Sequence, residues 1–161
     1  TVRLNLCATD AFSLITGFAS QTCWMPHKDF VRLLRIQLAG VLPSSHLLEL
    51  VRRVKFTSAS NTEAVALRSK ESLGRDISRE VATEGGAIPE TVVLDVPVWT
   101  TPGLDTSYRL TCAVEVDLER GMFALVPLPD EIERVENLAI EQIRERLADD
   151  LPEFAAFHGS P

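Results

Sequence analysis

The fold is decided by residues 107–118, which read Ser-Tyr-Arg-Leu-Thr-Cys-Ala-Val-Glu-Val-Asp-Leu. Apolar side chains occupy every second position from Tyr108 to Leu118, and the positions between them are polar or charged except for Ala113. Alternation with a period of two residues over this length predicts a long strand with one buried face and one solvated face. A tight turn at 119–121 and a second apolar run at 122–126 follow, so the sequence predicts a β-hairpin here.

Other segments extend the predicted sheet. Residues 91–99 also alternate, and Pro97, which lacks a backbone N–H, indicates that this strand lies at an edge or is bulged. Further strands are expected at residues 2–6, 53–59, 64–69 and 154–157, whereas residues 71–79 fit either a strand or a solvated loop. The strands at 91–99 and 154–157 would offer edges that could pair between subunits.

Helices are expected before and after the sheet. Thr9 or Asp10 can cap a short helix that ends near Phe18, and residues 21–25 are expected to form a loop. Pro26 fits the first turn of a helix that ends near Leu38, and another helix starts after residue 43. The last helix has an apolar stripe at helical spacing, which consists of Ile132, Val135, Ala139, Ile143 and Leu147.

These elements predict one α+β domain over residues 1–161. Its antiparallel twisted sheet would have about five to seven strands, with two N-terminal helices and one long C-terminal amphipathic helix packed on it. Residues 1–52 would form a mostly helical lobe, 53–128 the sheet, 129–150 the last helix, and 153–161 a terminal strand or tail. The composition, 45% hydrophobic and 24% charged, is ordinary for a soluble domain. No apolar run reaches the roughly 18 residues of a membrane span, so no membrane partner is expected.

Charge is divided unevenly along the chain. The net charge is −7, with +2 in residues 1–90 and −9 in residues 91–161. The acidic part would repel nucleic acid and anionic membranes. Nucleic-acid binding is therefore disfavoured for the whole chain, although the N-terminal part can still carry a local basic surface.

No sequence motif identifies an enzyme or a cofactor. The glycine-rich nucleotide loops, the GxSxG motif, the HExxH motif and the EF-hand loop do not occur in the sequence. His27, Asp29 and His46 could supply metal ligands, and Ser160 with His158 a nucleophilic pair, but each is better explained as a surface residue. We therefore assign no catalytic, cofactor-binding or metal-binding residue.

The cysteines indicate a reducing compartment. Cys7, Cys23 and Cys112 are odd in number and lack the close spacing of zinc ligands. We expect three reduced, packed thiols in a cytosolic protein.

A basic cluster on the second helix is a candidate binding surface. Lys28, Arg32 and Arg35 lie at positions i, i+4 and i+7, on the side away from the apolar residues. This cluster could be plain solvated helix, could bind phosphates of a nucleic acid, or could contact an acidic surface of a second copy of the chain.

The acidic last helix supplies the complementary candidate. Glu133, Glu141 and Glu145 lie opposite its apolar stripe, where a solvated face is the simplest explanation and acid–base pairs are an alternative. Trp99, together with Trp24, is a further candidate contact residue, because large aromatic side chains serve both cores and interfaces. Head-to-tail contact between the basic helix and the acidic helix would build a ring or a shell if it closes.

A series of short motifs runs from residue 24 to residue 161. In order, they are Asp29-Phe30, Val54-Lys55-Phe56-Thr57-Ser58, Ala87-Ile88-Pro89-Glu90, Leu94-Asp95-Val96-Pro97-Val98-Trp99, Tyr108-Arg109-Leu110 and Gly159-Ser160-Pro161. This order resembles the C-terminal part of the YfdQ-like family of phage and prophage proteins, a family of unknown function. The resemblance implies a phage or prophage gene product in a bacterial cytoplasm, and it implies no catalytic residues.

Three hypotheses on function follow. The first is a non-enzymatic phage- or prophage-derived protein that self-assembles into a homo-oligomer, such as a ring or a shell. The second is an accessory protein in phage DNA recombination or replication that binds nucleic acid through the basic helix face. The third is an enzyme of a type that the sequence does not reveal. For all three we expect no cofactor, and a cytoplasmic or phage-associated location.

Overall fold

The computed structural model describes residues 6–54, 82–83, 86–101, 103–104 and 106–153. Within this part the protein is a mixed α+β structure with a four-stranded antiparallel sheet, four α-helices and one short π-helix. The strands predicted at 64–69 and 154–157 lie outside the described residues, as do the segment 71–79 and most of the strands predicted at 2–6 and 53–59.

The main sheet has the strand order β1-β6-β5-β4, and all of its neighbouring strands are antiparallel. Its strands are β1 (Met25–Pro26), β4 (Thr91–Pro97), β5 (Ser107–Asp117) and β6 (Met122–Pro127). A separate two-stranded ribbon consists of β2 (Ala82–Thr83) and β3 (Gly86–Ala87). The prediction of about five to seven strands in one sheet is thus matched only in part. Strand β1 in turn lies where the sequence predicts the end of a loop and the start of a helix.

The hairpin of β5 and β6 is confirmed. Asp117 pairs with Met122 next to the turn, where Gly121 adopts a φ of 64°, a conformation that glycine reaches without a steric penalty. Arg109 and Glu115 of β5 are exposed on one face of the sheet. The buried positions of β5 alternate as predicted and are Leu110, Cys112 and Val114.

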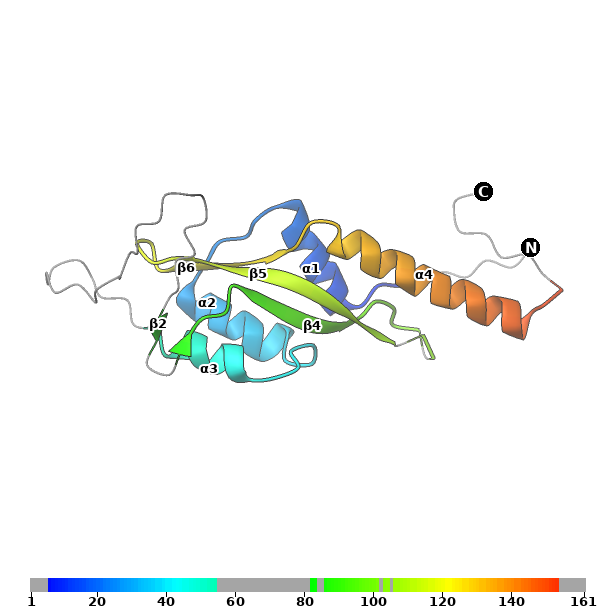
Figure 1. Cartoon of the computed structure of the whole chain (residues 1–161), viewed down its shortest axis with the longest axis horizontal. Coiled ribbons are helices and arrows are strands. Elements are labelled where there is room, and N and C mark those ends of the chain that lie inside the picture. Colours follow the sequence, from blue (N-terminus) through cyan, green and yellow to red (C-terminus); the bar gives the residue numbers. More distant parts are fainter. Residues whose placement is uncertain (1–5, 55–81, 84–85, 102, 105, 154–161) are drawn as a thin grey trace, which may run out of the picture.

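The helices join the strands in one buried cluster. They are α1 (Asp10–Ser20), α2 (His27–Arg32), α3 (His46–Arg52) and α4 (Glu131–Asp150). As predicted, Thr9 caps α1, because its hydroxyl accepts a hydrogen bond from the backbone N–H of Phe12 at 3.1 Å. Phe30 of α2 stacks on Phe123 of β6 with ring centroids 5.0 Å apart. Figure 1 shows that only the first part of α4 lies along the strands and that its last turns extend beyond them.

The second predicted helix changes its geometry part of the way along. Its last five residues form the π-helix η1 (Leu33–Gln37), and the backbone N–H of Leu38 donates to the carbonyl of Leu33 at 3.0 Å. A π-helix has more residues per turn than an α-helix. Leu38, which follows Leu34 by four residues on the apolar side of the segment, is fully buried, and Gln37 is exposed.

Strand β4 lies at the end of the sheet, but its outer edge is covered at several points. The backbone N–H of Asp95 donates to the carbonyl of Val41 at 2.8 Å, and the N–H of Thr9 donates to the carbonyl of Val98 at 2.9 Å. The hydroxyl of Thr9 also donates to the carbonyl of Pro97. The expectation that this edge is open for pairing between subunits is therefore wrong at these positions, because loops of the same chain already use its hydrogen-bonding groups.

Helix α4 covers an edge of β5. Strand β6 ends opposite Cys112, so residues 107–111 of β5 continue without a strand on that side. There Glu131 of α4 accepts a hydrogen bond from the backbone N–H of Thr111 at 2.7 Å, and Arg134 donates to the carbonyl of Arg109. Side chains of α4 thereby satisfy backbone groups that a longer β6 would have paired.

Candidate functional site

Glu131 and Arg134 form an ion pair whose role is structural. Their nearest charged atoms are 2.9 Å apart, and the Glu131 side chain is only 18% exposed. The hydrogen bond from Arg134, with that from the backbone N–H of Thr111, lowers the pKa of Glu131 from 4.5 to about 2. Burial, with a smaller contribution from the Glu131 charge, raises the pKa of the nearby Cys112 thiol to about 12. Cys112 is therefore held in its neutral, unreactive form.

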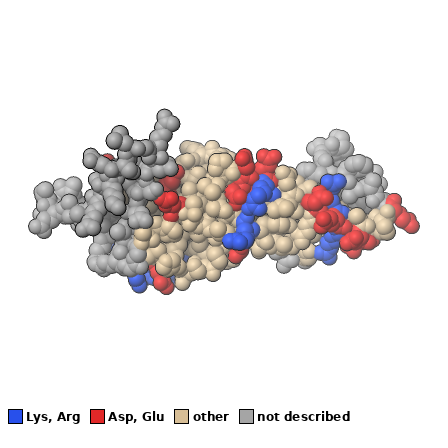
Figure 2. Space-filling view, in the orientation of Figure 1, with Lys and Arg blue, Asp and Glu red and all other residues tan. Residues whose placement is uncertain are grey.

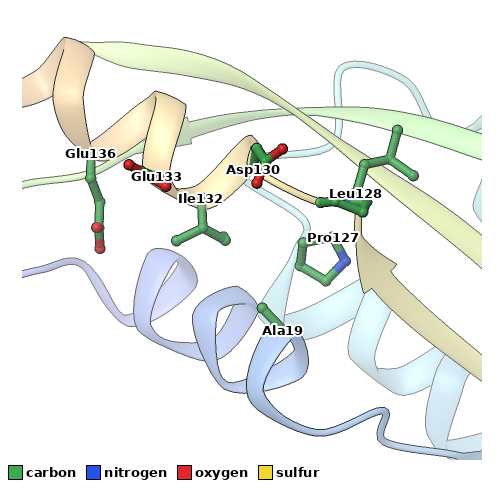
Figure 3. Close-up of a pocket in the computed structure, with 8 residues that line it drawn as sticks. Ala19, Pro127, Leu128, Asp130, Ile132, Glu133 and Glu136 are labelled. Atoms are coloured by element: carbon green, nitrogen blue, oxygen red, sulfur yellow. The ribbon is translucent and has the colours of Figure 1, made fainter.

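A hollow of about 450 Å³ opens to solvent where α4 begins. Its lining is Ala19, Pro127, Leu128, Pro129, Asp130, Ile132, Glu133 and Glu136. Figure 3 shows that Ile132 and Glu136 point from α4 toward α1, with Ala19 on the opposite side. Ala19, Pro127 and Ile132 thus supply apolar surface, while Asp130, Glu133 and Glu136 place carboxylates around it. We call this hollow the acidic groove.

A second exposed surface lies on α2 and η1. Lys28, Arg32 and Arg35 are all exposed, as predicted, and within the described chain they make no hydrogen bond or ion pair. Beside them Ile36 is 64% exposed, the highest value among the exposed large apolar residues. We call these four residues the basic surface. It combines unpaired positive charge with an apolar side chain that finds no cover in this part of the chain.

The predicted acidic residues do not form one uniform face. Glu133 borders the acidic groove, whereas Glu141 is paired with Arg144 at 3.1 Å and Glu145 is exposed further along α4. Figure 2 shows acidic and basic side chains close together on the face in view rather than in two separate fields. On this face (Figure 2), the charge division along the sequence therefore does not appear as two separate regions of opposite charge.

Trp99, a candidate for either a core or an interface role, packs against the core. Its side chain is half-buried against the core, and its backbone bridges to Ala8 in an isolated β-bridge. The indole N–H is buried and has no hydrogen-bond partner among the described residues. Trp24, by contrast, is 42% exposed. Trp99 therefore serves mainly to pack the segment before α1 against the end of β4.

The residues considered for catalysis or metal binding are not assembled into a site. The ring Nε2 of His27 lies 2.7 Å from the carbonyl of Val51, which ties the start of α2 to the end of α3. Asp29 and His46 are exposed, and among the described residues no group of three or more His, Cys, Asp or Glu side chains could hold a metal ion. His158 and Ser160 lie outside the described residues.

Sequence reasoning missed Ile36 and Glu131. Ile36 was detectable as an isolated apolar residue between Arg35 and Gln37, on the polar side of its helix. Glu131 has no such signal, because an acidic residue in the first turn of a helix is expected on electrostatic grounds alone. Its partner, the backbone of β5, is distant in the sequence and is reached only in the folded chain.

Comparison with known proteins does not assign the chain to a family. No protein-family model matches it, and neither the curated proteins nor the solved structures include a match. Within the described residues, we find no helix with the length and apolar character that crossing a bilayer requires.

Proposed function

We propose that this chain is a non-enzymatic protein of phage or prophage origin that works by assembling with copies of itself into a homo-oligomer. One observation carries the self-assembly: within the described residues, a single chain presents an unpaired basic surface and an acidic groove, and both include apolar residues. The phage or prophage origin rests on the order of sequence motifs, and with it the location in a bacterial cytoplasm or in a phage particle.

The two surfaces lie on different elements of the chain. The basic surface belongs to α2 and η1, and the acidic groove lies between α1 and α4. Contact between two different surfaces is heterologous. Each copy can therefore contact one neighbour through its basic surface and a second neighbour through its acidic groove. Such contacts build a ring or shell when the rotation between copies closes, and a filament when it does not.

Charge complementarity would guide this contact and make it depend on salt. Exposed charges are screened at high ionic strength, whereas burial of apolar surface is not weakened in that way. If charge attraction and apolar burial both drive assembly, we expect added salt to weaken the association but not to abolish it at high protein concentration.

The experiment is light scattering on nuclease-treated protein, in roughly 0.05 M and 0.5 M salt and over a range of concentrations. We expect a mass that is a multiple of 17.8 kDa at low salt and that falls toward the monomer at high salt. A monomer of 17.8 kDa under all conditions would contradict the proposal.

A second candidate function is nucleic-acid binding through the same basic surface. It is favoured by the exposure and lack of partners of Lys28, Arg32 and Arg35 within the described chain. Fluorescence anisotropy of a labelled DNA duplex tests it directly. If the three cations contact phosphates, replacing all of them with glutamine should reduce the slope of log affinity against log salt by roughly three.

A further inference from the structure

We infer that Ile36 of one copy inserts into the acidic groove of the next copy, with Arg32 and Arg35 facing the carboxylates of Glu133 and Glu136. This inference rests on the proposed self-assembly and names the contact that would produce it.

The π-helix presents Ile36 on an exposed part of the surface. The helical residues that pack inward are Phe30, Leu33 and Leu34, and Ile36 is exposed on another side. Arg32 lies four residues before Ile36, so a surface that covers Ile36 also meets the guanidinium group of Arg32, and the neighbouring Arg35 borders that surface. Short π-helices are rare and frequently occur at functional sites.

The acidic groove has room for an apolar side chain and has no cation of its own in its lining. Its volume of about 450 Å³ falls within the range of small binding cavities. The partly buried Ile132 supplies apolar surface next to the core cluster. None of the groove's three carboxylates, on Asp130, Glu133 and Glu136, is paired with a basic residue in the described structure.

The two surfaces match in both charge and polarity. Three exposed basic side chains and one exposed apolar residue lie on the same helical segment, and three carboxylates belong to the lining of the groove together with apolar residues. Covering Ile36 removes apolar area from water, and the surrounding opposite charges set the orientation. A second copy of this chain is the one partner already known to carry the required surface.

Site-directed crosslinking tests the contact. In a background with the exposed Cys7 and Cys23 replaced by serine, one protein carries Ile36→Cys and a second carries Ala19→Cys. Ala19 lines the groove and is exposed, so the substitution should not disturb the core. Under mild oxidation we expect a disulfide-linked dimer when the two proteins are mixed, and a much weaker dimer band from either protein alone.

A matched control uses Leu138→Cys in place of Ala19→Cys. Leu138 is also on the surface, at 48% exposure, but it does not line the groove. We expect little crosslinking between Leu138→Cys and Ile36→Cys. Equal crosslinking at Leu138 and Ala19 would mean that the cysteines meet by random collision, and it would overturn the inference.

The variant Ile36→Asp separates this inference from the proposed function. We expect it to weaken self-association tenfold or more, since burying an exposed isoleucine contributes on the order of one to two decades in affinity. Three results together would show that the inference is wrong while self-assembly stands: the wild-type chain is an oligomer, Ile36→Asp assembles equally well, and Ala19→Cys does not crosslink to Ile36→Cys. If the wild-type chain is a monomer throughout, both fail.

Discussion

Helix α4 and the segment formed by α2 and η1 are both amphipathic and charged, but they use their charges differently. In α4, Glu131 and Arg134 bond to each other and to the backbone of β5. In α2 and η1, Lys28, Arg32 and Arg35 bond to nothing in the described part of the chain. The first set stabilises the fold, and the second set is available to a partner.

The difference shows that charged side chains on a helix surface can have different roles. Helix α4 lies beside an edge of β5 that lacks a partner strand, so polar side chains there find backbone donors and acceptors. Segment α2–η1 is attached through its apolar side, where Phe30 stacks on Phe123, and through His27 at its start, whose ring contacts the carbonyl of Val51. Lys28, Arg32 and Arg35 take no part in this attachment within the described chain. Its polar side therefore has no structural task in the described chain and can be changed without affecting the core.

The largest effect should come from removing the apolar attachment of α2. Phe30→Ala deletes a fully buried ring that stacks on Phe123, and we expect a loss of about 3–5 kcal/mol in the free energy of unfolding. Ile36→Ala, in the same helical segment but exposed, should change it by less than about 0.5 kcal/mol. Urea denaturation followed by circular dichroism measures both. Similar losses in the free energy of unfolding would show that the buried and exposed sides of this segment contribute equally to stability, which contradicts the prediction.

A smaller effect is expected from breaking the contact between α4 and β5. Glu131→Ala leaves the N–H of Thr111 and the guanidinium of Arg134 without their acceptor, and should cost about 1–3 kcal/mol. Glu141→Ala is the matched control, because Glu141 forms the same i,i+3 ion pair with Arg144 but is 57% exposed. The control should lose less than about 1 kcal/mol. Equal losses in the free energy of unfolding would show that the hydrogen bond to the backbone of β5 adds no stability beyond that of the ion pair.

The smallest effect is the pH dependence of the same contact. The folded-state pKa of Glu131 is about 2, below its ordinary value of 4.5, so its contribution to stability is complete above 4.5 and is lost as the pH falls toward 2. We expect wild-type stability to fall more steeply between roughly pH 5 and pH 2 than that of Glu131→Gln. The change should be smaller than in Glu131→Ala, because a protonated carboxyl can still accept a hydrogen bond. Parallel pH profiles would contradict this assignment.

Much of the secondary structure could be predicted because it depends on local patterns. Alternation along β5 correctly predicted its buried positions Leu110, Cys112 and Val114, and Thr9, one of the two predicted caps of α1, is the cap in the structure. The switch to a π-helix at Leu33 could not be predicted, because the apolar positions of this segment, Phe30, Leu34 and Leu38, fit a regular α-helix. The short strand β1 exists only because β6 lies beside it.

The basic surface was predicted from spacing, and its exposure is confirmed at Lys28, Arg32 and Arg35. The acidic groove was not predicted as such, because its lining comes from α1, the end of β6 and the start of α4, which are far apart in the sequence. By itself, the sequence determined the charges, the apolar stripes and the long hairpin, since these depend on neighbouring residues. Only the tertiary structure decided which carboxylates bond to the backbone of β5 and which remain around a groove, because hydrogen-bond partners distant in sequence meet only when the chain has folded.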